Sequence, residues 1–124
     1  MSFNNLGLSP ALNKALAGQN YLEPYPIQEQ AIPAILKGKD VLGIAQTGSG
    51  KTLAYALPVL MNLQKKTLSQ SRHINVLVLV PTRELAEQVK EVFKTFALAM
   101  PERIKTLAVY GGVSINPQMM ALQG

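Results

Sequence analysis

Hydrophobic and polar residues along this chain follow patterns that predict helices and short strands in turn. The clearest helix covers residues 84–98, where apolar side chains recur every three or four positions and charged side chains occupy the opposite face. The clearest strand is Asn75–Val80, which is apolar on both faces and therefore typical of a parallel strand covered on two sides. Shorter apolar runs predict two further strands, at Val41–Ile44 and Lys105–Tyr110.

Capping residues and prolines predict where the other helices begin. Ser9 is a typical N-cap, and Pro10 suits the first helical position, so a helix should extend to about Ala17. Three more helices are expected, over residues 27–36, over residues 51–63 and from Asn116 onward.

After two leading helices, the order of the predicted elements is strand, helix, strand, helix, strand, helix. This alternation indicates an α/β fold, with three layers built around a mostly parallel sheet. In such sheets ligands bind beyond the C-terminal ends of the strands. Three unusual segments follow those ends here, starting at Ala45, Pro81 and Gly111.

Composition narrows the classes of function. The chain has 124 residues, 48% of them hydrophobic, which is enough for the core of one domain or of a part of one. The absence of cysteine excludes disulfides and thiolate metal sites. No apolar run approaches the roughly 18 residues of a membrane helix, and the first residues do not resemble a signal peptide. We therefore expect a cytoplasmic protein with no membrane partner, and its net charge of +5 permits binding to a polyanion.

The segment Ala45–Thr52, called the phosphate loop below, predicts a nucleotide site. Its sequence AQTGSGKT fits G-x-x-x-x-G-K-[ST] except for alanine at the first position. Small residues allow backbone N–H groups to surround phosphate oxygens, Lys51 would reach the β and γ phosphates, and Thr52 would ligate Mg²⁺. A glycine-rich turn without function is the alternative, but a strand is predicted before the loop and a helix after it. The expected phosphate-binding residues between its ends are Gln46, Thr47, Gly48, Ser49 and Gly50.

A hydrolytic set is not evident beside this loop. Phosphoryl transfer in this class requires an acid at the end of a neighbouring strand. Asp40 precedes its predicted strand and so lies at the wrong end of the sheet. Glu84 follows a strand, but an acid in the first turn of a helix is the better interpretation of its position.

Four ordered motifs resemble those of DEAD-box RNA helicases and together span essentially the whole chain. Asn20–Gln28 resembles the Q motif, and Phe3 lies seventeen residues before it, as the isolated upstream aromatic of that family does. The phosphate loop resembles motif I, in which alanine at the first position is normal. Pro81–Ala86 resembles motif Ia, and the pair Gly111 and Gly112 resembles the GG segment.

The chain also departs from the pattern of that family. Asn20 stands where glycine is usual, a mild change because asparagine tolerates a left-handed backbone. Tyr25 stands where a small hydroxyl residue is usual and could alter how the Q motif seats the phosphate loop. The DEAD tetrapeptide and the second lobe are not in this sequence. We therefore expect residues 1–124 to be the N-terminal portion of the first RecA-like lobe of a helicase, similar to bacterial members.

The resemblance implies roles for the residues of an adenine-nucleotide site. Gln28 would recognise adenine through its side-chain amide, whose donors and acceptor match the edge of the base. Phe3 would stack on the base, and Tyr21 would support the pocket. From the residues alone, without the spacing of that family, a core anchor for the first helix would be the preferred interpretation of Phe3. Lys51 and Thr52 are the expected catalytic residues, with ATP or ADP and Mg²⁺ as cofactors.

The resemblance also implies contacts to RNA. Arg83 would offer its charged fork to a phosphate, and glycines would allow the backbone close approach, so binding would not depend on base sequence. The alternative for Arg83 is an intramolecular salt bridge, and the sequence favours neither. The double glycine alone could belong to any turn. The expected RNA-contact residues are Pro81, Thr82, Arg83, Gly111 and Gly112.

Three hypotheses about function follow. The chain could be part of an ATP-dependent RNA helicase, not catalytic by itself. It could instead be a non-catalytic module that binds adenine nucleotide and RNA. A third possibility, an unrelated phosphate-loop kinase or transporter ATPase, is disfavoured by the Q-like and Ia-like segments. An exposed sheet edge would also favour self-association.

Overall fold

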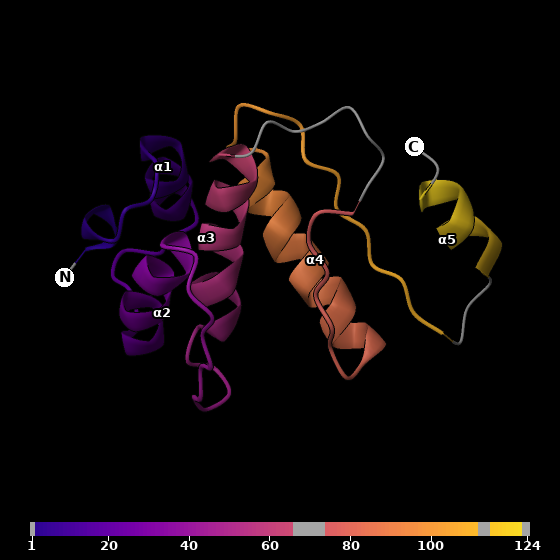
Figure 1. The fold of residues 1–124 in the computed structure, drawn as a ribbon, viewed down its shortest axis with the longest axis horizontal. Coiled ribbons are helices and arrows are strands. Elements are labelled where there is room, and N and C mark those ends of the chain that lie inside the picture. The colour runs from indigo at the N-terminus through magenta and orange to yellow at the C-terminus, as the bar shows by residue number, and fades with distance from the viewer. Residues whose placement is uncertain (1, 66–73, 112–114, 123–124) are drawn as a thin grey trace.

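A computed structural model describes residues 2–65, 74–111 and 115–122 (Figure 1). The chain forms a short 3₁₀ helix and then α-helices of between 8 and 15 residues. No helix in this described part is long and apolar enough to cross a membrane. The elements in order are η1 (Phe3–Asn5), α1 (Pro10–Gly18), α2 (Pro26–Leu36), α3 (Lys51–Lys65), α4 (Arg83–Ala97) and α5 (Ile115–Leu122).

The predicted helices are confirmed, and their ends lie where local capping residues place them. The Oγ atom of Ser9 accepts a hydrogen bond from the Leu12 N–H at 3.2 Å, which caps α1 as expected. The Oγ1 atom of Thr82 accepts one from the Leu85 N–H at 3.1 Å and caps α4. Side-chain caps of this kind satisfy backbone donors that the first turn of a helix leaves unpaired.

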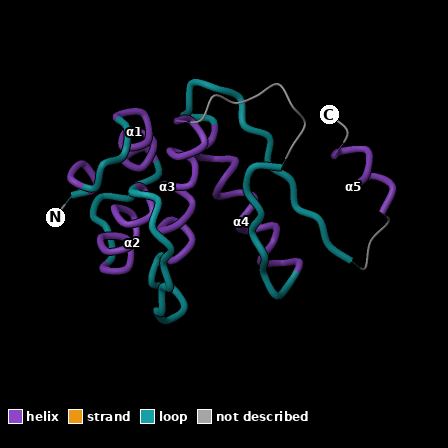
Figure 2. Tube along the Cα trace, viewed as in Figure 1, coloured by secondary structure: helices purple, strands orange, loops and turns teal. Residues whose placement is uncertain are grey.

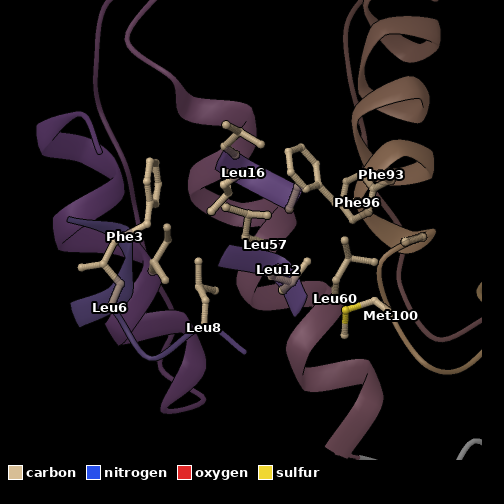
Figure 3. Packing of buried hydrophobic residues seen from close by; sticks show 14 of the residues in the cluster. Phe3, Leu6, Leu8, Leu12, Leu16, Leu57, Leu60, Phe93, Phe96 and Met100 are labelled. Carbon is tan, nitrogen blue, oxygen red and sulfur yellow. The ribbon is translucent and has the colours of Figure 1, made fainter. Parts of the chain in front are cut away.

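The hydrophobic core is built around α3, which packs against α2 on one side and α4 on the other (Figure 1). Leu57 and Leu60 of α3 are completely buried, as are Leu12 of α1 and Ile32 of α2. Figure 3 shows leucines of α1 and α3 meeting phenylalanines of α4 in one cluster. Because this core holds α2 and α3 together, the two helices support the Q-like segment and the phosphate loop side by side.

The three predicted strands are not found as strands in the described residues. Val41–Ile44, Asn75–Val80 and Lys105–Tyr110 are non-helical segments without strand pairing, as Figure 2 shows. Several of their apolar side chains are open to solvent, with exposed fractions of 85% at Ile44 and 84% at Leu79. The physical reason is that a strand is held by hydrogen bonds to a neighbouring strand, and no such pairing joins these segments within the described residues.

Exposure along two of these segments nevertheless alternates with the period of a strand. Val76 and Val78 are 38% and 36% exposed, whereas Leu77 and Leu79 are 74% and 84% exposed. Residues 103–110 alternate in the same way between exposed and half-buried positions. A period of two places successive side chains on opposite sides of an extended backbone. One side of each segment is therefore less exposed than the other.

Candidate functional site

The phosphate loop, Ala45–Thr52, forms a turn that leads directly into α3. Gly48 and Gly50 adopt left-handed backbone conformations, with φ values of 84° and 83°. A side chain at Gly48 would meet no atom within 4 Å. A Cβ atom at Gly50 would collide with the Gln28 amide nitrogen and would lie 2.7 Å from Cδ2 of Tyr25. Gly50 is thus required by close packing as well as by its backbone conformation.

Hydrogen bonds within the loop close it on itself. The carbonyl oxygen of Gln46 accepts hydrogen bonds from the N–H of Ser49, at 3.2 Å, and from its hydroxyl. The Lys51 ammonium donates to the carbonyl oxygen of Ala45 at 2.5 Å. Lys51 is exposed, so its ammonium could leave this carbonyl for a phosphate oxygen at little cost.

Gln28 joins the Q-like segment to the phosphate loop. Its side chain is 1% exposed. The Oε1 atom accepts a hydrogen bond from the Tyr25 N–H at 2.9 Å, and the Nε2 atom donates to the carbonyl oxygen of Gly50 at 3.1 Å. The Gln28 N–H donates in turn to the Tyr25 carbonyl oxygen at 2.9 Å, which closes a reciprocal cap at the start of α2. The orientation of this amide is therefore set by both segments at once.

The start of α3 supplies groups suited to an anion and to a cation. The first N–H groups of a helix have no intrahelical acceptor, and their dipoles favour negative charge. Thr52 lies in this first turn and shares a side-chain hydrogen bond with Tyr55; burial raises the pKa of Tyr55 more than this bond lowers it. The described residues contain no group of three or more acidic, histidine or cysteine side chains that could hold a metal ion. Thr52 is thus the one predicted metal ligand that the structure places at the loop.

Phe3 and Tyr21 lie apart from the phosphate loop in this structure. Phe3 is 4% exposed and packs in the core cluster with Leu6 and Leu8 (Figure 3). This is the core-anchor position that the residues alone allowed. Tyr21 is 42% exposed, and its ring centroid lies 6.3 Å from that of Phe96. For the predicted contacts with adenine to form, the base would have to extend to both rings, or the rings would have to move toward the base.

The residues resembling motif Ia lie at the start of α4. Pro81, Thr82 and Arg83 are all exposed. The Nε atom of Arg83 lies 3.4 Å from Oε1 of Glu84, and the two side chains are 54% and 72% exposed. Such an exposed ion pair contributes little to stability. The intramolecular salt bridge is therefore present, but the Arg83 guanidinium can still exchange Glu84 for another anion. Glu84 is a first-turn acid, as its sequence position indicated.

Tyr110 connects α4 to the segment that ends in the double glycine. Its hydroxyl donates to Oε1 of Glu87 at 2.8 Å, and its N–H donates to Oε1 of Gln118 at 2.7 Å. The hydrogen bond to Glu87 raises the pKa of Tyr110, with smaller contributions from burial and from the negative charge of Glu87. Gly111 is exposed directly after this anchored residue, whereas Gly112 lies outside the described residues.

The amino-acid sequence matches a known protein family over most of its length. Residues 25–124 match the family model for DEAD/DEAH box helicases. The chain belongs to the DEAD/DEAH box helicase family. The match includes the phosphate loop and both predicted RNA-contact segments, and it begins at Tyr25 inside the Q-like segment.

Curated helicases of bacteria are similar over almost the entire chain. The DEAD-box ATP-dependent RNA helicase RhpA of Helicobacter pylori is 46% identical over 117 residues, which are 94% of this chain and 22% of RhpA. The ATP-dependent RNA helicase DeaD of Escherichia coli K12 is 44% identical over 122 residues, which are 98% of this chain and 19% of DeaD. The chain thus spans about a fifth of the length of these relatives.

Solved DEAD-box structures confirm the fold at the level of the family. The RNA helicase Prp28 from Chaetomium thermophilum bound to ADP superimposes with a TM-score of 0.86 at 34% identity, over 98% of this chain and 30% of that one. A DEAD box protein from Methanococcus jannaschii gives a TM-score of 0.82 at 34% identity, over 98% and 32%. The helices of this DEAD/DEAH box chain are therefore placed as in these proteins.

Sequence reasoning missed several contacts of this DEAD/DEAH box site, among them the hydrogen bond from Gln28 to Gly50. The Tyr25–Gln28 cap had a signal, because glutamine three residues after the N-cap is the spacing of a capping box. The hydrogen bond from Lys51 to the Ala45 carbonyl and the one from Tyr110 to Glu87 had no signal in the sequence. Both join groups whose proximity depends on the fold.

Proposed function

We propose that this chain is the nucleotide-binding and RNA-contacting part of an ATP-dependent RNA helicase. In the whole protein, ATP binding and hydrolysis would be coupled to unwinding or remodelling of RNA duplexes. The chain alone would bind nucleotide without turning it over, because within the described residues no acid forms an ion pair or a hydrogen bond with the phosphate loop. The observation that carries this proposal is the hydrogen bond from Gln28 to Gly50, which joins the Q motif to a phosphate loop with the backbone that its glycines require.

The chemistry of the loop suits ATP or ADP. Gly48, Ser49 and Gly50 would present backbone N–H groups to the phosphates at the start of α3. Lys51 would exchange its bond with the Ala45 carbonyl for one with a phosphate oxygen. Prp28, which superimposes on nearly all of this chain, was solved bound to ADP, and this supports an adenine nucleotide as the ligand here.

Adenine selectivity would depend on Gln28. Its amide keeps one N–H and one acceptor lone pair beyond the two hydrogen bonds that it makes. Those groups would match the N6 and N7 edge of adenine once the buried amide is opened to the base, and they do not match guanine, which presents two acceptors there. Phe3 and Tyr21 would complete the pocket only if the base reaches them.

Mg²⁺ would be held by the Thr52 hydroxyl. This ion keeps several waters and is usually bound by one or two protein groups together with substrate phosphates. A single hydroxyl at the phosphate loop fits that requirement, and when bound the ion would neutralise charge on the β and γ phosphates.

RNA would bind where α4 begins and where the segment 105–111 ends. Arg83 is exposed there and has only a weak partner, and the exposed backbone of Gly111 allows close approach. The names of the relatives, which are RNA helicases, support this assignment. Contacts of a guanidinium and of backbone groups to phosphates would be independent of base sequence.

We further propose that the three apolar segments become strands of a parallel sheet in the whole lobe, as in a RecA-like domain. The alternating exposure of two of them supports this, since one face of each is less exposed than the other. In the chain by itself the open faces would promote self-association. A cytoplasmic location stays a prediction from the sequence.

The test is the affinity of the chain for ADP and GDP by isothermal titration calorimetry with Mg²⁺. We expect tighter binding of ADP, loss of that preference in Gln28→Ala, and weaker binding of both nucleotides in Lys51→Ala. Lys37→Ala is the matched control, because Lys37 is an exposed lysine at the far end of α2. Equal binding of ADP and GDP by the folded wild-type chain would refute the adenine site, and ATP turnover by the chain would refute its lack of catalysis.

A further inference from the structure

Glu87 lies one helical turn after Arg83 on α4, at the spacing where opposite charges on a helix attract each other. Arg83 would therefore be expected to pair with Glu87. Its partner in the structure is instead Glu84, at 3.4 Å. An arginine that has to bind a phosphate would be partly neutralised by a carboxylate on the next turn, so what restrains Glu87 matters for this site.

Both carboxylate oxygens of Glu87 have other partners. Oε1 accepts the hydrogen bond from the Tyr110 hydroxyl at 2.8 Å. Oε2 lies 4.0 Å from the ammonium of Lys90, on the side of α4 away from Arg83 along the helix. The short bond to Tyr110 is the stronger restraint, because 4.0 Å is too long for a hydrogen bond.

Tyr110 is itself held in place. Its N–H donates to Gln118 of α5 at 2.7 Å, so its backbone and its hydroxyl are anchored to different helices. A tyrosine hydroxyl with an ordinary pKa of about 10 is protonated, and thus a donor, throughout the neutral pH range, and the hydrogen bond to Glu87 shifts the pKa of Tyr110 further upward. Tyr110 also lies directly before Gly111, so it connects the two segments that the proposed RNA contact needs.

We propose that Tyr110 is a positioning residue for RNA: it holds the Glu87 carboxylate away from Arg83 and thereby leaves the guanidinium available to an RNA phosphate. This inference rests on the proposed contact between Arg83 and RNA. When the hydroxyl is removed, Glu87 is free to turn toward Arg83 and to compete with the phosphate. The effect of Tyr110 on RNA affinity therefore depends on the negative charge of Glu87. Without that charge, removing the Tyr110 hydroxyl should leave the RNA affinity unchanged.

The experiment measures binding of the chain to fluorescein-labelled decauridine by anisotropy at several salt concentrations. We expect Tyr110→Phe to weaken binding about twofold to fivefold, the range of the one exposed ion pair between Arg83 and Glu87 that would then compete with the phosphate. The slope of log affinity against log salt should fall by up to about one, since one phosphate contact is weakened. The double variant Tyr110→Phe/Glu87→Gln should restore wild-type affinity and slope, although it lacks the same hydroxyl.

Arg83→Ala separates this inference from the proposed function. If Arg83→Ala weakens binding but Tyr110→Phe does not, or if the double variant fails to restore affinity, the role of Tyr110 is refuted and the RNA contact stands. If Arg83→Ala binds decauridine as tightly as wild type, the RNA contact and the role of Tyr110 are both refuted.

Two further measurements exclude a merely structural effect. Unfolding by urea should show the double variant to be no more stable than Tyr110→Phe, because neither has the hydrogen bond, while their RNA affinities differ. Glu87→Gln alone should bind RNA at least as tightly as wild type, since its amide still accepts from Tyr110 but carries no charge. Weaker binding by Glu87→Gln would contradict the proposal even if Tyr110→Phe did not fold.

Discussion

Gly48 and Gly50 share a left-handed backbone but differ in their surroundings. Their φ values are 84° and 83°, yet only Gly50 would bring a Cβ atom against Gln28 and Tyr25. Alanine at either position would be destabilised by about 1–2 kcal/mol because of its backbone. The difference between the effects of the two substitutions therefore isolates the contact between the phosphate loop and the Q-like segment.

We predict that Gly50→Ala weakens ADP binding more than Gly48→Ala does and costs at least about 1 kcal/mol more stability, the minimum for a buried amide that loses its partner. Urea unfolding and calorimetric titration with ADP would measure the two effects on the same samples. Equal losses in both variants would mean that the bond between Gln28 and Gly50 does not support the nucleotide site.

The hydroxyl of Tyr110 should also make stability depend on pH in the alkaline range. Its pKa is raised by the hydrogen bond to Glu87, so the folded chain holds this proton more tightly than the unfolded chain does. The stability contributed by the bond is fully present below the ordinary tyrosine pKa of about 10 and is lost as pH rises through the higher folded-state value. The difference in unfolding free energy between wild type and Tyr110→Phe should thus shrink above pH about 10.

Comparison of these two proteins by urea unfolding across the alkaline range would test this expectation. The raised pKa of Tyr55 is present in both proteins and cancels in the difference. A difference that stays constant or grows with pH would show that the Tyr110 hydroxyl is not held by a carboxylate.

At the scale of single elements, α4 depends on its N-terminal cap. The Thr82 hydroxyl accepts from the Leu85 N–H, a bond that serine can make and valine cannot. We predict that Thr82→Val lowers the unfolding free energy by about 1 kcal/mol, whereas Thr82→Ser changes it little. Thermal and urea denaturation would measure both. A loss in Thr82→Ser as large as in Thr82→Val would assign the role of Thr82 to its methyl group instead.

Such caps explain why the helices could be predicted from sequence and the strands could not. The hydroxyls of Ser9 and Thr82 each bond an N–H three residues further along, so the local sequence determines where α1 and α4 begin. A strand such as Asn75–Val80 requires a partner strand from elsewhere in the chain. The apolar pattern of the segment indicates only that it suits burial and does not identify that partner. The helix ends accordingly agree with expectation, while the strand pairing is absent from the described residues.

The candidate site likewise has features that the local sequence predicts and features that depend on the fold. The left-handed glycines of the phosphate loop follow from the local requirement for residues without a Cβ atom. The burial of Phe3 in the core, and the bond between Tyr110 and Glu87, depend on how distant segments pack. No local pattern specifies which of two roles an aromatic residue such as Phe3 takes.

At the scale of the whole molecule, apolar side chains collect on the solvent side of the extended segments. Leu42, Ile44, Leu77 and Leu79 are each between 74% and 87% exposed. Burying a leucine side chain is favourable by about 1.5–3 kcal/mol, and an extended backbone without a neighbour also offers unpaired N–H and C=O groups. These faces therefore favour association with another extended segment over contact with water.

We accordingly predict that the chain self-associates through its extended segments. Light scattering over a concentration series should give a mass that rises above that of the monomer, and Leu79→Lys should shift the onset to higher concentration. Leu98→Lys is the matched control, because Leu98 is 81% exposed but lies after α4 rather than in an extended segment. An equal shift in both variants would indicate general apolar attraction, and a monomeric wild-type chain at all concentrations would contradict the prediction outright. A specific response to Leu79→Lys would instead show that the extended segments retain the pairing tendency of the sheet proposed for the whole lobe.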